Sequence, residues 1–338
     1  MVSALFVALQ LSAPAAAGND ARRARLALAS MDRTFLDRRS GDYRERAGGR
    51  VGSHAWPFSQ ALAATIDVAA VPHHGRGAGR EVVSRLRALD ERFRSHGVYR
   101  ASPGGHVYYD DNEWVAFDLL DWDGVRSDPE ARTEAEQVFD AVVRAWDPDP
   151  QQTCPGGIQW TDAPGNDDRN TVSTANGAVL GLRLYQLTHR TRYLRWGRRM
   201  LAWVDRCMRG PDGLYGDHVS GDGVIDRTEW SYNQGAVLDA YRLLYLITND
   251  RDDLGRAEAI ADRTLATFAE RWSDGEPPEF AAIFFRRLLE LADVDGRADY
   301  VAAAQAYADR LWRQPRPRLF DQAAVVQLYA ALAARAAA

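Results

Sequence analysis

The sequence predicts an all-α protein, an (α/α)6 barrel of six helical hairpins. Apolar residues recur at helical spacing along most of its 338 residues, and hardly any stretch alternates as a strand would. Helices that are apolar nearly all round alternate with amphipathic ones, as expected when buried helices lie beside helices that face water. Six such pairs, repeating at roughly 40–60 residues, are enough to close a ring. An open right-handed solenoid is the competing architecture, and the lack of a strict repeat consensus disfavours it.

The N-terminal segment predicts export. Residues 2–17 form an apolar run that ends in Ala13-Pro14-Ala15-Ala16-Ala17, so residues 1–17 are expected to be a signal peptide with its cleavage site. The basic residues that usually precede such a run are missing, and an Ala-rich helical N-terminus is the alternative. Residues 18–338 would then form a single barrel domain of a secreted or extracytoplasmic protein.

The predicted outer helices are amphipathic and have short connections. The first begins at the N-cap pair Asn19-Asp20 and runs to about residue 37, and the second covers residues 79–95. Pro129 opens the third, which the run Asp147-Pro148-Asp149-Pro150 stops. The other three are expected over residues 191–209, 252–272 and 298–312.

The predicted inner helices are apolar nearly all round and follow the long loops. Their starts lie near Pro57, Asp111, Thr171, Trp230, Glu279 and Asp321. Because all six would begin at one rim of the barrel, we expect the side chains at these starts to gather there.

The composition excludes several classes of function. The net charge of −5 argues against binding to nucleic acids. All 42 basic residues are Arg, which rules out a lysine nucleophile or Schiff base. No stretch reaches the roughly 18 apolar residues of a membrane span. Cys154 and Cys207 could form a disulfide or remain two free thiols, and their spacing does not decide between these states.

The most informative stretch is the pair Asp110-Asp111. A loop containing Pro103, Gly104 and Gly105 precedes the pair, and an apolar helix follows it, so the pair lies at or near a helix N-cap. An N-cap with a solvated neighbour is the simplest interpretation. Aromatic residues crowd the pair, however, and adjacent Cα atoms are about 3.8 Å apart. Two neighbouring carboxyls can therefore reach the roughly 5 Å separation that retaining glycoside hydrolysis requires.

Aromatic residues at the other inner starts predict a carbohydrate groove around this pair. Aromatic faces combined with acids, amides and hydroxyls suit sugar rings, which present both C–H patches and OH groups. The residues expected to line the groove are Trp56, Tyr108, Tyr109, Trp160, Trp230 and Tyr232.

Four motifs in order make nearly the whole chain resemble glycoside hydrolase family 76, the endo-α-1,6-mannanases. They are Tyr109-Asp110-Asp111-Asn112-x-Trp114, Gly156-Gly157-Ile158-x-Trp160, Ser173-Thr174-Ala175-Asn176-Gly177 and Tyr232-Asn233-Gln234-Gly235. The resemblance implies an (α/α)6 fold and a retaining mechanism, with Asp110 as nucleophile and Asp111 as acid/base. It adds the substrate contacts Asn112, Asn176, Asn233 and Gln234. Glu113 departs from the family pattern, where a small residue is usual, and Asn176-Gly177 is also a looser match.

No metal or organic cofactor is expected. Four aspartates of one Gly-rich loop (Asp212, Asp217, Asp222 and Asp226) do not match an EF-hand, so a solvated loop is favoured, with Asp217 as a substrate contact. The histidines His73, His74 and His96 lack a third ligand at zinc spacing.

The resulting hypothesis is a monomeric, exported hydrolase of α-mannan that acts through a glycosyl–enzyme intermediate. A transglycosylase on the same glycans would use the same intermediate. A non-catalytic carbohydrate-binding protein is a second alternative, which the intact Asp110-Asp111 pair disfavours. A sugar epimerase on the same fold would need histidine or glutamate bases at several inner starts, and these loops lack such histidines.

Overall fold

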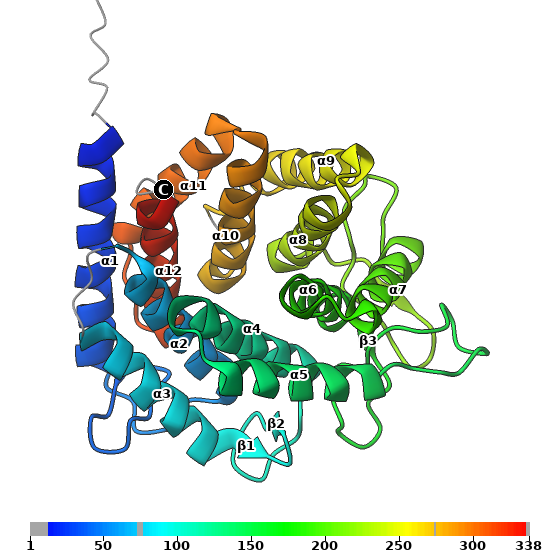
Figure 1. The fold of residues 1–338 in the computed structure, drawn as a ribbon, viewed down its shortest axis with the longest axis horizontal. Helices are drawn as coiled ribbons and strands as arrows, with labels where there is room; N and C mark the ends of the chain where they lie inside the picture. The colour runs from blue at the N-terminus through cyan, green and yellow to red at the C-terminus, as the bar shows by residue number, and fades with distance from the viewer. Residues whose placement is uncertain (1–12, 73–76, 274, 336–338) are drawn as a thin grey trace, which may run out of the picture.

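The computed structural model describes residues 13–72, 77–273 and 275–335, and in these residues twelve α-helices form an (α/α)6 barrel. Six inner helices surround the axis and six outer helices surround them (Figure 1). The inner ring consists of α2 (Ala55–Ala70), α4 (Tyr109–Arg126), α6 (Thr171–Thr188), α8 (Ser231–Thr248), α10 (Pro278–Asp295) and α12 (Leu319–Arg335). The outer ring consists of α1 (Ala13–Phe35), α3 (Gly77–Phe93), α5 (Pro129–Arg144), α7 (Thr191–Cys207), α9 (Arg251–Phe268) and α11 (Ala298–Trp312).

The ring is closed, which excludes the open solenoid. Each inner helix packs against the next, and α12 packs against α2. One helix pair of the ring comes from the two ends of the described chain, because α1 packs mainly against α12 (Figure 1). Arg23 on α1 fastens this contact by donating a hydrogen bond to the Tyr329 hydroxyl (2.8 Å) and pairing with Asp309.

The alternation of helix character has the predicted physical basis. The inner helices bury residues on all sides, as α4 does from Asp111 to Asp123 with only Asp121 partly exposed, whereas outer helices such as α5 bury one stripe. The only strands in the described residues are two residues long: the hairpin of β1 (Arg94–Ser95) with β2 (Val98–Tyr99), and a sheet of β3 (Arg169–Asn170), β4 (His218–Val219) and β5 (Ile225–Asp226). Such short strands have no recognisable sequence pattern.

Two differences between the predicted and the observed helix starts change the interpretation of particular residues. Helix α1 begins at Ala13 rather than at Asn19-Asp20, consistent with the high helix propensity of alanine and the tolerance of proline in a first turn. The signal peptide remains a prediction, since residues 1–12 lie outside the described residues. Helix α4 begins at Tyr109 with Tyr108 as N-cap, so Asp110 and Asp111 lie in its first turn and do not cap it.

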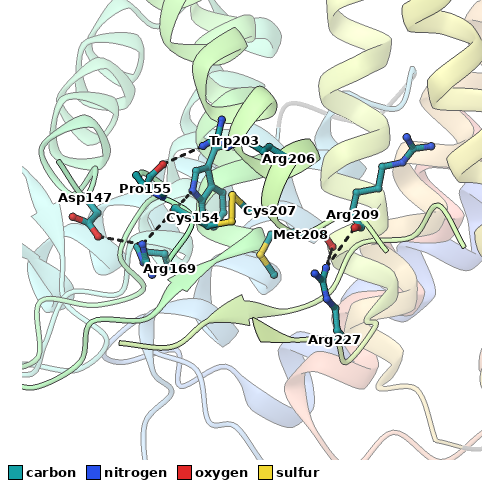
Figure 2. The surroundings of a disulfide bond; sticks show 10 residues. All are labelled: Asp147, Cys154, Pro155, Arg169, Trp203, Arg206, Cys207, Met208, Arg209 and Arg227. Atoms are coloured by element: carbon teal, nitrogen blue, oxygen red, sulfur yellow. Dashed lines mark hydrogen bonds and ion pairs between the residues drawn. A yellow bond between two sulfur atoms is a disulfide. The ribbon is translucent and has the colours of Figure 1, made fainter. Parts of the chain in front are cut away.

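The two cysteines form a disulfide, which the sequence left open. Cys154, in the loop after α5, is joined to Cys207 at the end of α7 (Figure 2). The carbonyl of Cys154 accepts hydrogen bonds from Trp203 Nε1 (3.0 Å) and from the buried Arg169 (3.3 Å). Gly157 has φ +91° and lies so close to the Trp203 ring that a Cβ would be 2.6 Å from it, so only glycine fits. The Gly156-Gly157 motif thus anchors this loop beside the barrel.

Candidate active site

A cavity of about 840 Å³ lies at the rim where the inner helices begin. The second residue of five inner helices lines it, as does the third residue of α10. These are Trp56, Asp110, Val172, Tyr232, Phe320 and Phe280. The second or third residue of each inner helix therefore faces the cavity, which is why side chains from distant parts of the chain meet there.

The fourth residue of an inner helix faces the opposite way, because two residues advance a helix by about 200°. At this position Asn112 Oδ1 accepts from the Tyr99 N–H (2.7 Å) and its Nδ2 donates to the Tyr99 carbonyl (2.8 Å). Gln234 clamps the N–H and carbonyl of Tyr215 in the same way (2.9 and 2.8 Å). Thr174 accepts from the Ile158 N–H (3.0 Å). These motif residues hold the preceding loops in place.

The loop after α5 brings Trp160 to the cavity. The Trp160 carbonyl accepts from the N–H of Tyr109 (2.9 Å), and the Trp160 ring meets Tyr108 edge-on with centroids 4.9 Å apart. Thr161 Oγ1 donates to the Val107 carbonyl (2.7 Å). The loop is thus tied directly to the start of α4, and one aromatic wall of the cavity comes from these two segments.

A second aromatic wall lies across the starts of α2, α8, α10 and α12. Phe280 is 4.3 Å from Tyr232 and 6.0 Å from Trp56 between ring centroids, and Trp56 is 4.5 Å from Phe320. Trp230 packs behind Phe280 at 5.5 Å and does not line the cavity. The two walls give the cavity apolar faces on which sugar rings could stack.

Asp110 and Asp111 line the same cavity as these walls, and the pKa values of both are raised. Burial raises the pKa of Asp110 to about 7, although hydrogen bonds from its own and the next backbone N–H and from the Trp160 side chain oppose the rise, and the charge of Asp217 adds to it. Burial and the neighbouring charge of Asp110 raise the pKa of Asp111 well above its ordinary value. Two such neighbours share their protons, so one is ionised while the other remains protonated. This is the charge arrangement that acid-assisted nucleophilic attack requires.

Asp217 adds a third carboxylate to the cavity. Its Oδ1 accepts from Asn233 Nδ2 (3.2 Å) and Tyr232 OH (3.4 Å), and its Oδ2 lies 3.0 Å from His218 Nδ1. Asp217, His218 and Asp226 could each offer one ligand atom within 4.8 Å of the others. Hydrogen bonds already engage Asp217 and also Asp226, which accepts from the Thr228 N–H (2.7 Å), so we assign no metal to this group.

Seven of the thirteen predicted site residues line the cavity: Trp56, Tyr108, Asp110, Asp111, Trp160, Asp217 and Tyr232. The other six do not line it. Asn112 and Gln234 hold the preceding loops in place of the expected substrate contacts, Asn233 donates a hydrogen bond to Asp217, and Asn176 is buried. Tyr109 and Trp230 lie beside the aromatic walls and outside the cavity lining.

Several lining residues were missed from the sequence. They include Phe280 and Phe320, which occupy the axis-facing start of α10 and α12, and the polar residues Glu45, His54, His106, Asp168, Asn170 and His218. The repeated second position of the inner helices would have identified Phe320, whereas Phe280 is the third residue of α10 and falls outside that pattern. Of the histidines considered for zinc, His96 lies in the exposed turn after β1 and His73 and His74 lie outside the described residues.

A helical barrel with a carboxyl pair in an aromatic cavity defines a class of carbohydrate-active enzyme. Comparison with known proteins identifies the family. The family model "Glycosyl hydrolase family 76" matches residues 25–295, and the chain belongs to this family of glycoside hydrolases.

The fold is shared with solved structures of this family. A family 76 mannosidase of Bacteroides thetaiotaomicron superposes with a TM-score of 0.84 at 21% identity, over 94% of this chain and 98% of that one. An inactive variant of the α-1,6-mannanase GH76A of Salegentibacter sp. HEL1_6, in complex with α-1,6-mannotriose, superposes with a TM-score of 0.81 at 19% identity, over 93% and 99% of the two chains.

Among curated relatives, a mannan endo-1,6-alpha-mannosidase of Candida glabrata is 30% identical over 124 residues, which is 33% of this chain and 27% of that protein. A mannan endo-1,6-alpha-mannosidase of Candida albicans is 33% identical over 133 residues, covering 35% and 27%. The matches thus span about a quarter of these relatives' length.

Proposed function

We propose that the protein is a retaining, endo-acting glycoside hydrolase that cleaves α-1,6-mannosidic bonds in mannan-type polysaccharides. The observation that carries the proposal is that the adjacent pair Asp110 and Asp111 lines the aromatic cavity. Among the ion pairs of the described residues, neither carboxyl has a basic partner. A carboxylate without a basic partner is free to act on a substrate.

The reaction would proceed in two steps. The Asp110 carboxylate attacks the anomeric carbon, the bond to the leaving oxygen breaks, and Asp111 gives that oxygen its proton. Asp111 then takes a proton from water, and the water oxygen displaces Asp110, which restores both residues. The raised pKa values of the pair suit these roles, because two coupled carboxyls titrate in two steps and one can be ionised while the other remains protonated. No cofactor is needed for this chemistry.

The substrate class is inferred from the relatives. The yeast relatives are named mannan endo-1,6-alpha-mannosidases. The Salegentibacter structure is that of an inactive α-1,6-mannanase variant in complex with α-1,6-mannotriose. The two aromatic walls of the cavity are suited to a polysaccharide chain that lies across the rim. We also propose that the protein acts outside the cytoplasm, which the Cys154–Cys207 disulfide supports because such bonds persist in oxidising compartments.

The test measures oligosaccharide release from linear α-1,6-mannan by the wild type, Asp110→Asn and Asp111→Asn. We expect release by the wild type and a loss of about 10³-fold or more in both variants. A substrate with an activated phenol as leaving group separates the roles. Asp111→Asn should recover on it, since such a group leaves without a proton, whereas Asp110→Asn should not.

Three outcomes would contradict parts of this proposal. Variants that cleave mannan as fast as the wild type would exclude Asp110 and Asp111 from catalysis. A wild type that binds mannan without cleaving it would favour a carbohydrate-binding protein. Longer products formed from added oligosaccharide acceptors would identify a transglycosylase.

A further inference from the structure

Glu113, the fifth residue of α4, is a buried carboxyl that the proposed mechanism does not use. Its exposed fraction is 0%, and neither of its oxygens has a hydrogen-bond partner among the described residues. A carboxylate in such surroundings would be strongly destabilised unless it were protonated. Burial, and then the charge of Asp110, raise the pKa of Glu113 well above its ordinary value. Glu113 therefore carries a proton, and a neutral carboxylic acid is a hydrogen-bond donor.

On the side of α6, the carboxyl of Glu113 packs closely against a glycine. A Cβ placed on Gly177 of α6 would lie 3.1 Å from Glu113 Oε1, 3.0 Å from Met200 Sδ and 3.1 Å from Val142 Cγ1. Val142 of α5 and Met200 of α7 therefore lie beside Glu113 at this point, and neither of them titrates. Asp110 is the charged group that acts on Glu113.

Asp110 lies on the neighbouring side of the same helix. Residues three apart on a helix have Cβ atoms about 5–6 Å from each other. Asp110 Oδ1 is buried and also lacks a hydrogen-bond partner among the described residues. Asp110 Oδ1 is thus an acceptor without a donor, and it lies about one helical turn from the Glu113 carboxyl, a donor without an acceptor. Buried polar atoms are nearly always paired in folded proteins, directly or through an ordered water.

We propose that Glu113 is a positioning residue of the reaction: as a neutral acid it hydrogen-bonds Oδ1 of Asp110, directly or through one buried water, and orients that carboxylate toward the sugar. The inference rests on the proposed function. Glu113 keeps its proton throughout the cycle, so the proton balance of the two steps is unchanged. A donor to the charged form of a carboxylate favours ionisation. Glu113 would thereby counteract part of the effect of burial on Asp110.

The test compares Glu113→Gln, whose amide still donates, with Glu113→Leu, which has a similar volume and no donor. Glu113→Gln should keep kcat/KM on mannan within about threefold of the wild type, with the same pH profile. Glu113→Leu should lower kcat at least tenfold with little change in KM, and should move the acid limb of kcat/KM upward by about half a pH unit or more.

The matched control is Asp118→Asn. Asp118 is another buried carboxyl of α4 whose Oδ2 has no hydrogen-bond partner among the described residues, and it lies two turns from Asp110. This variant should leave kcat and the pH profile unchanged. The proposal is overturned if Glu113→Leu behaves like the wild type, if Glu113→Gln is as impaired as Glu113→Leu, or if Asp118→Asn causes the same shift.

Thermal unfolding separates this inference from the proposed function. A group protonated in the folded state and ionised in the unfolded state destabilises the protein as the pH rises above its ordinary pKa. Between pH 4 and pH 8 the Tm of the wild type should therefore fall relative to that of Glu113→Gln. This difference without mannan cleavage would reject only the hydrolase, whereas cleavage without the difference would reject only the role of Glu113.

Discussion

Carboxyl groups lie at both mouths of the barrel, but they differ in whether they form ion pairs with arginine. At the mouth opposite the candidate active site, the inner helices end around a cavity of about 640 Å³. The carboxyls there pair with arginines: Asp121 with Arg183 (2.5 Å), Asp67 with Arg286 (2.9 Å), Asp293 with Arg335 (2.6 Å) and Glu290 with Arg287 (2.8 Å). At the active mouth, Asp110 and Asp111 take part in no ion pair of the described residues.

The difference separates structural charges from functional ones. A buried carboxyl that is paired with arginine supports the fold, and removing its partner leaves an uncompensated group. A buried carboxyl without such a partner costs stability, and where it also lines a large cavity, as Asp110 and Asp111 do, it is a candidate for chemistry. The opposite mouth is rich in acids, yet pairing leaves little for a ligand to engage. The pairing of carboxyls with arginines therefore distinguishes the two mouths better than the number of carboxyls does.

The largest expected effects come from two substitutions, one of a carboxyl at the active mouth and one of an arginine at the opposite mouth. Asp110→Asn should abolish mannan cleavage, with a loss of about 10³-fold or more, and should leave the protein at least as stable as the wild type at pH 7. Arg286→Ala at the opposite mouth should lower the free energy of unfolding by about 3 kcal/mol, because it leaves Asp67 without its partner. The folded fraction of Arg286→Ala should keep kcat/KM within about twofold of the wild type.

Denaturant unfolding and initial rates on mannan measure both sides of this comparison. Asp67→Asn is the matched control, since it removes the other partner of the same ion pair and should also spare kcat/KM. If the folded Arg286→Ala variant lost as much activity as Asp110→Asn, the opposite mouth would be part of the catalytic machinery. The distinction between the two mouths would then be wrong.

The disulfide tests how much the active mouth depends on its loops. Cys154–Cys207 closes a separation of 53 residues and anchors the loop that carries Trp160. Cys207→Ser should lower the free energy of unfolding by about 2–4 kcal/mol, and Cys154→Ser should do the same. We also expect a rise in KM, because Trp160 belongs to this loop. Unfolding of the wild type in a reductant provides the control. The reductant should lower the free energy of unfolding of the wild type and leave that of the serine variants unchanged.

The sequence predicted the parts of this mouth that depend on local pattern. The alternating helix character, the six inner starts and the Asp110-Asp111 pair are all visible within single stretches. It missed Phe280 and His218, since only ring closure brings their segments to Asp110. It also assigned Asn112 and Gln234 to the substrate, because a motif does not reveal that positions two and four of a helix face opposite ways. The pairing of α1 with α12 likewise has no local signal.

The pH dependence of activity should reflect the active mouth alone. Asp110 must be ionised to attack, and its pKa is raised to about 7, so kcat/KM should fall roughly tenfold per pH unit below pH 7. Asp111 must stay protonated, and its raised pKa sets a fall at higher pH. Initial rates from pH 5 to pH 9 measure both limbs.

Asp67 is the control for this profile. Burial raises its pKa to about 7 as well, although it lies at the opposite mouth. Asp67→Asn should leave both limbs of the profile in place. An acid limb near pH 4 in the wild type, as for an ordinary aspartate, would mean that Asp110 is not held in the buried state that the structure shows.

The smallest expected effect concerns the aromatic walls, with Trp160 as the decisive residue. Trp160→Ala removes a ring that faces the cavity and contacts Tyr108, and it should raise KM for mannan about tenfold while kcat changes less. Trp160→Phe keeps a ring but loses the N–H that lowers the pKa of Asp110, so it should retain most of the affinity and move the acid limb upward. Trp196→Ala, on the outer helix α7, is the matched control and should change neither quantity. If Trp160→Ala lowered kcat with KM unchanged, Trp160 would act on the nucleophile rather than on the sugar. The aromatic walls would then have to be attributed to packing, and the active mouth would be defined by its carboxyls alone.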